Sequence, residues 1–234
     1  MEDIVTKIES RTYLSIQHIE SAALFTRLAY RIEQSYDGKY NKDLISEHRA
    51  YVIGAIFCST SFLEASINEF FCDINDEQTV NNLFKNLNQR TIQIISHHWE
   101  KGIPRTAKYS IIDKYQIALE LLNKNKFEKG NNPYQAVKSL SLLRNALIHY
   151  EPEWITHPIS NPKIISHKFE ESLKGKFKNN PLVSDVNPFY PDKVLSHGCA
   201  EWGVKSSIEF VDKFFKKTGL KPRFNHTCSS LYTQ

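Results

Sequence analysis

Apolar residues recur three and four positions apart along several long stretches of the chain, and no stretch alternates strictly between apolar and polar residues. The first spacing places side chains on one face of an α-helix, whereas strict alternation is typical of a half-buried β-strand. The pattern therefore predicts an all-α fold. The helices that it predicts span residues 13–36, 43–74, 76–99, 108–126, 133–150 and 192–218.

Residues that begin or end helices support several of these bounds. Asp37-Gly38 ends the first helix, and Gly219 directly follows the last one. Asn132-Pro133 is a good start signal for the helix at 133–150, because Asn caps free amides and Pro tolerates the first helical position. We therefore expect this fifth helix to begin at about residue 133.

From residue 154 to residue 191 the helical pattern is lost, and five prolines fall in this stretch. We expect a Pro-rich loop excursion here, either ordered or mobile, and a loose tail after residue 222. No internal repeat, low-complexity block or linker divides the chain. Residues 1–234 are therefore expected to form a single domain, a bundle of about six helices around the long helix at 43–74.

Composition is that of an ordinary globular protein, with 41% apolar and 24% charged residues. No basic region precedes an apolar run at the N-terminus, and the longest weakly polar stretch, 51–62, is too short to cross a bilayer. The four cysteines show no paired spacing. We expect a cytoplasmic protein with reduced cysteines and no membrane span. The net charge of +4 is compatible with a polyanionic partner but does not require one.

One predicted helix carries a charged residue inside its apolar face. On a helical wheel, Arg144 falls in the middle of an apolar face formed by Tyr134, Val137, Leu140, Leu143, Leu147 and Ile148. A buried guanidinium needs either an anionic partner or an opening through which a ligand reaches it. Asn145 and His149 stand one turn apart at the margin of this face. We therefore expect three polar side chains to gather there, one of them an imidazole able to exchange protons at neutral pH.

A purely structural interpretation of the same residues is available. Glu64 and Asn68, one turn apart on the helix at 43–74, offer the polar partner that Arg144 requires. In that interpretation Glu64 pairs with Arg144, and His149 is a partly exposed histidine at a helix end, the usual fate of such residues. Spacing alone favours this interpretation over a catalytic one.

The run from Arg144 to His149, Arg-Asn-Ala-Leu-Ile-His, resembles the motif of the HEPN superfamily. In that motif an Arg, commonly followed by a polar residue, precedes a His by four to six positions late in a helix. The resemblance covers the helices between residues 43 and 218, but neither the first helix nor the Pro-rich excursion, and it implies an HEPN-like helical bundle that forms a homodimer. Many members are metal-independent ribonucleases of toxin–antitoxin, phage-defence or RNA-processing systems, and others only bind. Some HEPN toxins carry a Tyr two positions after the His, which an antitoxin modifies, whereas here Tyr150 follows His149 directly.

The resemblance implies RNA cleavage in which the ribose 2′-hydroxyl attacks the adjacent phosphate, with no metal or other cofactor. His149 would accept the proton, Arg144 would bind phosphate oxygens, and Asn145 would orient one of these groups. The supporting residues would be Glu64, Asn68 and Tyr150. Basic residues that can follow an RNA backbone, although solvated loops account for them as well, are Lys101, Arg105, Lys108, Lys174, Lys176 and Lys178.

Other functions are less well supported. His97-His98 and His197-Gly198-Cys199 lack the spacing of known metal or dithiol motifs, so no metal site is predicted. Glycines occur singly and form no phosphate-binding loop, which argues against an ATPase. The remaining alternative is a catalytically inactive HEPN-like module that binds RNA or a protein. For a toxin of this type, an antitoxin or another regulatory protein is the expected partner.

Overall fold

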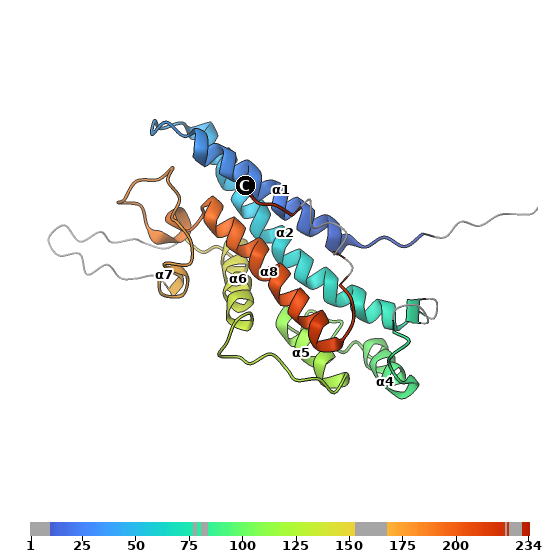
Figure 1. Ribbon diagram of the computed structural model, residues 1–234. Coiled ribbons are helices and arrows are strands. Elements are labelled where there is room, and N and C mark those ends of the chain that lie inside the picture. Colours follow the sequence, from blue (N-terminus) through green and yellow to red (C-terminus); the bar gives the residue numbers. More distant parts are fainter. Residues whose placement is uncertain (1–9, 77–78, 81–83, 153–167, 223, 225–230) are drawn as a thin grey trace, which may run out of the picture.

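The computed structural model describes residues 10–76, 79–80, 84–152, 168–222, 224 and 231–234. Every regular element in these residues is helical, as the apolar spacing predicts (Figure 1). The elements are α1 (Leu14–Ser35), α2 (Lys42–Ile74), α4 (Gln89–Glu100), α5 (Ile111–Leu121), α6 (Tyr134–Ile148), α7 (Lys168–Leu173), the π-helical turn η1 (Phe189–Lys193) and α8 (His197–Thr218).

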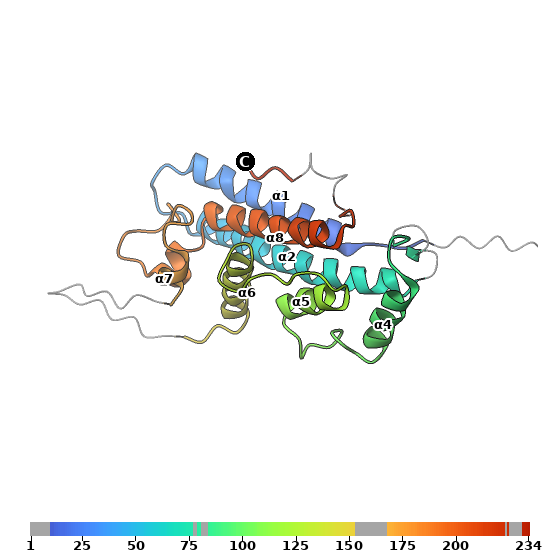
Figure 2. The same ribbon diagram turned by 60° about the horizontal axis from the view of Figure 1, so that its bottom comes forward.

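The long helix α2 is the core helix, as predicted. It contacts α1, α4, α5, α6 and α8. Helices α1, α2 and α8 lie side by side, and α4, α5 and α6 pack below them (Figure 2). Tyr115 of α5 lies edge-on to Phe210 and Phe214 of α8, at 4.9 Å from each ring, and its hydroxyl donates to the Leu63 carbonyl of α2. Burial of each such ring stabilises the fold by roughly 1.5–3 kcal/mol.

The apolar part of α2 extends beyond residues 51–62, the stretch that was judged too short to cross a bilayer. By length and composition, α2 is the one helix in the described part of the chain that could cross a membrane. Half of its most apolar window is buried inside the protein, which is the pattern of a core helix. This single helix is therefore weak support for a membrane span.

Two predicted helices are longer than the observed ones. The helix expected at 76–99 is interrupted, because Asn88 caps a new helix by accepting a hydrogen bond from the Thr91 amide at 2.8 Å. The helix expected at 108–126 begins only after Ser110, which caps the Asp113 amide in the same way, and it ends at Leu121. In both places a local capping bond sets a boundary that apolar spacing does not reveal.

Helix α6 matches its predicted range within two residues at each end, but its first turn is not capped as predicted. Pro133 occupies the N-cap position and makes no side-chain capping bond. The expected cap by Asn132 is therefore wrong. The first turn is closed by backbone bonds instead, from the Gln135 amide to the Asn131 carbonyl and from the Val137 amide to the Pro133 carbonyl.

The predicted Pro-rich excursion is largely packed where it is described. Residues 153–167 of it lie outside the described residues. The rest includes α7 and η1, from which Phe169, Leu173, Phe189 and Tyr190 are buried. Of the two alternatives, an ordered excursion describes this part, because four large apolar side chains of the segment join the core.

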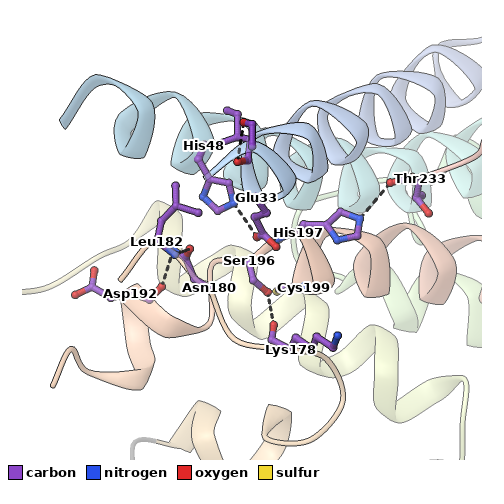
Figure 3. A network of polar contacts seen from close by, with 12 residues as sticks. Glu33, His48, Lys178, Asn180, Leu182, Asp192, Ser196, His197, Cys199 and Thr233 are labelled. Carbon is purple, nitrogen blue, oxygen red and sulfur yellow. Dashed lines mark hydrogen bonds and ion pairs between the residues drawn. The ribbon is translucent and has the colours of Figure 1, made fainter. Parts of the chain in front are cut away.

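The end of the chain is also held in place. The carboxylate of Glu33 accepts hydrogen bonds from Nε2 of His48 at 2.9 Å and from the backbone amide of His197 at 2.6 Å (Figure 3). Nε2 of His197 in turn donates to the Thr233 carbonyl at 3.1 Å. The loose tail expected after residue 222 is therefore wrong for residues 231–234, which dock on α8 through this last bond and on α1 through the Arg27 guanidinium, a donor to the Tyr232 carbonyl at 2.6 Å. Residues 223 and 225–230 lie outside the described residues.

Candidate functional site

Arg144 lies at the margin of the buried face of α6. Val137, Leu140 and Leu143 of this helix are fully buried against α2 and α8. Ile148, which was expected on the same face, is about half exposed, and Arg144 itself is partly buried. The apolar face is thus narrower than the helical wheel predicted, because the last turn of α6 lies at the edge of the core. Arg144 therefore meets solvent as well as protein.

An open cavity of about 390 Å³ lies in front of Arg144. Three helices form it, and we call it the Arg144 cavity. Its lining residues are His18 of α1, Phe57, Thr60, Ser61, Glu64, Ala65 and Asn68 of α2, and Arg144 and Ile148 of α6. The structure thus brings three predicted residues, Arg144, Glu64 and Asn68, to one cavity.

The predicted ion pair between Glu64 and Arg144 is not formed. Glu64 pairs with the ammonium group of Lys114 from α5, which also donates to Oδ1 of Asn68 at 3.2 Å. The Lys114 side chain is only 3% exposed, so its charge depends on these partners. Arg144 is partly open to water, so its charge needs an anionic partner less than that of the buried Lys114 does. The buried ammonium therefore takes the carboxylate.

Sequence reasoning missed two residues of this site. The sequence does contain a signal for Lys114, because this charged residue interrupts the apolar repeat of Ile111, Tyr115 and Ala118. Arg144 interrupts the apolar repeat of α6 in the same way. His18 had no such signal, because its place opposite Arg144 depends on how α1 and α6 both pack against α2. The Arg144 cavity therefore contains an imidazole that the motif does not supply.

His149 lies outside the Arg144 cavity. It is the C-terminal cap of α6, and its amide donates to the Asn145 carbonyl at 2.8 Å. Its exposed side chain borders a second hollow of about 230 Å³, which we call the His149 hollow and which is also lined by Ala146, Tyr150, Glu151, Lys168, Phe169 and Tyr190. The expected convergence of Arg144, Asn145 and His149 on one spot is thus not seen within one chain.

Helix geometry explains this separation. Five residues at about 100° each place Arg144 and His149 roughly 140° apart around the helix axis. Asn145 and Ile148 fall between them on the wheel, and both are exposed. A ligand that contacts both Arg144 and His149 of one chain must therefore lie across the last turn of α6.

The predicted basic residues fall into two separate groups. Lys101, Arg105 and Lys108 lie between α4 and α5, and the Arg105 guanidinium lies 5.6 Å from the ring centre of Trp99. Figures 1 and 2 place α4 and α7 at opposite ends of the bundle, so this group is remote from α7. The second group, exposed and directly after α7, consists of Lys174, Lys176 and Lys178. It belongs to the same segment as Lys168 of the His149 hollow.

The residues considered for metal or thiol chemistry have structural partners. In the described ranges, no three His, Cys, Asp or Glu side chains are placed to hold a metal ion. Cys199 is a free thiol in the core, and burial raises its pKa well above the usual value. A reactive cysteine needs the opposite shift. Cys228 lies outside the described residues.

Comparison with known proteins finds no counterpart: no family model matches the chain, and neither a curated protein nor a solved structure matches it.

Proposed function

We propose that this chain is a metal-independent endoribonuclease of the HEPN type that acts as a homodimer, in a toxin–antitoxin or phage-defence system. The observation that carries the proposal is the state of Arg144. It lines an open cavity, and the carboxylate that shares this cavity is paired with Lys114. No ion pair to Arg144 is found among the described residues, so its guanidinium can bind a phosphate.

The proposed reaction is an internal phosphoryl transfer. The 2′-oxygen of ribose bonds to phosphorus while the bond from phosphorus to the 5′-oxygen breaks. His149 takes the proton of the 2′-hydroxyl, and the departing 5′-oxygen takes a proton from a water molecule, to which the protonated His149 then returns one. Arg144 offsets the negative charge that builds up on the phosphate oxygens. The products are a 2′,3′-cyclic phosphate and a 5′-hydroxyl.

A dimer accounts for the separation of Arg144 and His149 along α6. One continuous exposed face of this helix begins beside Arg144 and carries Ile148, Asn145, His149 and Leu142. A two-fold axis beside this face would bring two copies of the motif together. The phosphate would then meet Arg144 and His149 at the junction of the two copies.

A non-enzymatic RNA-binding module is the second candidate. The observation that favours it is that Arg144 and His149 border different hollows within one chain. In that case Arg144 still binds phosphate, but no proton acceptor lies beside it. The two candidates differ in a single measurable outcome, the production of new RNA ends.

The test is incubation of the pure protein with mixed RNA and with single-stranded DNA, with and without a chelator. Cleavage of RNA alone, unaffected by chelator and leaving cyclic or 3′-phosphate ends, supports the nuclease. Arg144→Ala and His149→Ala should each lower the rate by about 10²-fold or more. Matched controls are Arg90→Ala and His97→Ala on α4, which remove exposed residues of the same types outside both hollows. Equal cutting of DNA, or loss of activity with chelator, would contradict the proposal.

A further inference from the structure

An exposed aromatic ring lies directly beside His149. Tyr150 is 50% exposed, and its ring centre lies 6.2 Å from that of Tyr190. Tyr190 is buried and lies 5.1 Å from Phe169, which is also buried. The outer face of Tyr150 is thus open to a ligand, while the two inner rings form a packed support behind it. Such a platform loses little conformational freedom when a flat ring stacks on it.

The charges around this platform suit one nucleotide. The His149 hollow, at about 230 Å³, is smaller than the sites that hold drug-sized molecules, which start at roughly 300 Å³. It can take one flat ring system. Lys168 borders the hollow and supplies a cation for a phosphate, and Glu151 supplies a carboxylate that can accept hydrogen bonds from an exocyclic amine.

The basic segment that follows α7 is held rigidly. The Ser196 hydroxyl donates to the Lys178 carbonyl at 2.7 Å, and the Phe177 ring lies 5.8 Å from that of Trp202. Lys174, Lys176 and Lys178 are exposed on this segment. These three lysines follow Lys168 in the sequence, and the backbone that carries them is attached to α8. They can therefore contact further phosphates of an RNA strand whose first phosphate lies at Lys168.

We propose that the His149 hollow binds one unpaired nucleobase next to the scissile phosphate, stacked on Tyr150, and that the substrate is therefore single-stranded RNA. This inference rests on the proposed ribonuclease function. A base inside a duplex is stacked on both faces and paired at its edge, so it cannot present a free face to Tyr150. Stacking on one aromatic ring also tolerates any base, which predicts weak sequence preference at this position.

The test measures binding without cleavage. A single-stranded RNA with 2′-O-methyl groups throughout cannot undergo 2′-hydroxyl attack, so its affinity for the wild-type dimer can be measured by fluorescence anisotropy. Tyr150→Ala should weaken binding roughly 5- to 150-fold, and Tyr150→Phe, which keeps the ring, should bind like wild type. Tyr40→Ala removes a more exposed tyrosine outside both hollows and should have no effect.

Two further measurements sharpen the assignment. A 2-aminopurine base placed along the strand should lose fluorescence on binding at one position, and only when Tyr150 keeps its ring. Lys168→Ala should reduce the slope of log affinity against log salt by about 0.7, the value for one phosphate contact on a single strand. Thermal melting of each variant checks that the fold is retained.

The outcomes separate this inference from the proposed function. If the wild-type protein cuts RNA but Tyr150→Ala binds the modified strand as tightly as wild type, the base site is wrong and the ribonuclease stands. Equal affinity for a duplex of the same sequence also overturns the base site. If the protein neither cuts RNA nor binds the modified strand, the ribonuclease proposal fails and the base site fails with it.

Discussion

Arg144 and His149 stand five residues apart on α6, yet their side chains border different hollows on either side of the last helical turn. Arg144 shares its cavity with His18 and Glu64, and His149 shares its hollow with Tyr150 and Lys168. A phosphate at the end of α6 can touch both only across the exposed turn or between two copies of the chain.

Substitution of Leu142 should separate the dimer. Leu142 is 51% exposed and shares its helix face with His149, so a carboxylate there would be buried without a partner in the proposed interface. We expect Leu142→Glu to be monomeric in light scattering and to lose ribonuclease activity. Leu14→Glu changes a leucine of equal exposure on α1 and should leave the mass and the activity unchanged. A wild-type monomer at micromolar concentration would refute the dimer.

The shape of the Arg144 side chain should matter as well as its charge. A guanidinium can donate two parallel hydrogen bonds to phosphate oxygens, and an ammonium is a point charge that cannot. Arg144→Lys should therefore retain RNA binding but lower the cleavage rate roughly tenfold to a hundredfold. Single-turnover kinetics with saturating protein separates the two quantities. An unchanged rate would mean that Arg144 contributes charge alone.

The Glu64–Lys114 pair should respond unequally to loss of either partner. Lys114 is 3% exposed and Glu64 is 36% exposed. Glu64→Ala leaves a buried ammonium without its carboxylate and should lower the free energy of unfolding by about 3 kcal/mol. Lys114→Met leaves a carboxylate that water can reach and should lower the free energy of unfolding by about 1 kcal/mol. Urea unfolding of both variants measures the difference. The reverse order would show that Glu64, not Lys114, is the group that depends on the pair.

Gly198 should be irreplaceable at the start of α8. A Cβ atom there would lie 3.0 Å from Cβ of Phe177 and 3.3 Å from the backbone nitrogen of Lys178. Neither neighbour is the free end of a flexible side chain, so Gly198→Ala should cost roughly 1–3 kcal/mol and loosen the basic segment. Faster tryptic cleavage after Lys174, Lys176 and Lys178 reports the loosening. Gly130→Ala, with nothing within 4 Å, should show neither effect.

Acid should release the C-terminal segment. Burial opposes ionisation of Glu201, but hydrogen bonds from Lys205 and Thr233 outweigh it and hold the pKa of Glu201 below its ordinary value of 4.5. A lowered folded-state pKa means that this carboxylate stabilises the fold fully above pH 4.5 and that the contribution is lost as the pH falls through the lower value. The protection of residues 231–234 against hydrogen exchange, measured relative to the intrinsic exchange rate at each pH, should therefore fall below about pH 4.5.

Two variants complete that test. Glu201→Gln at neutral pH should release the segment as acid does, because a neutral amide oxygen accepts the hydrogen bond of the Thr233 hydroxyl more weakly than a carboxylate does. Glu209→Gln removes an exposed carboxylate paired with Lys213 one turn away and should leave the segment docked. Equal exchange rates in the two variants would show that Glu201 does not hold the end of the chain.

The spacing of apolar residues was sufficient to predict the helical class and the long core helix. It also gave the approximate position of α6, which carries Arg144 and His149. These features are local: every helical turn repeats the same backbone bonds, and a buried face must recur every three or four residues. Local signals also failed in recognisable ways, since Asn88 and Ser110 cap new helices inside stretches whose apolar pattern continues.

The contacts of the site could not be predicted in this way. From the sequence, Glu64 was expected to pair with Arg144, and only the packing of α5 against α2 decided that the buried Lys114 takes it. The packing of α1 and α6 against α2 put His18 and Arg144 in one cavity. Helix formation depends on neighbours along the chain, so the sequence by itself determined which segments are helical. Which polar groups meet depends on how far each helix is buried by distant segments, and only the tertiary structure decided that.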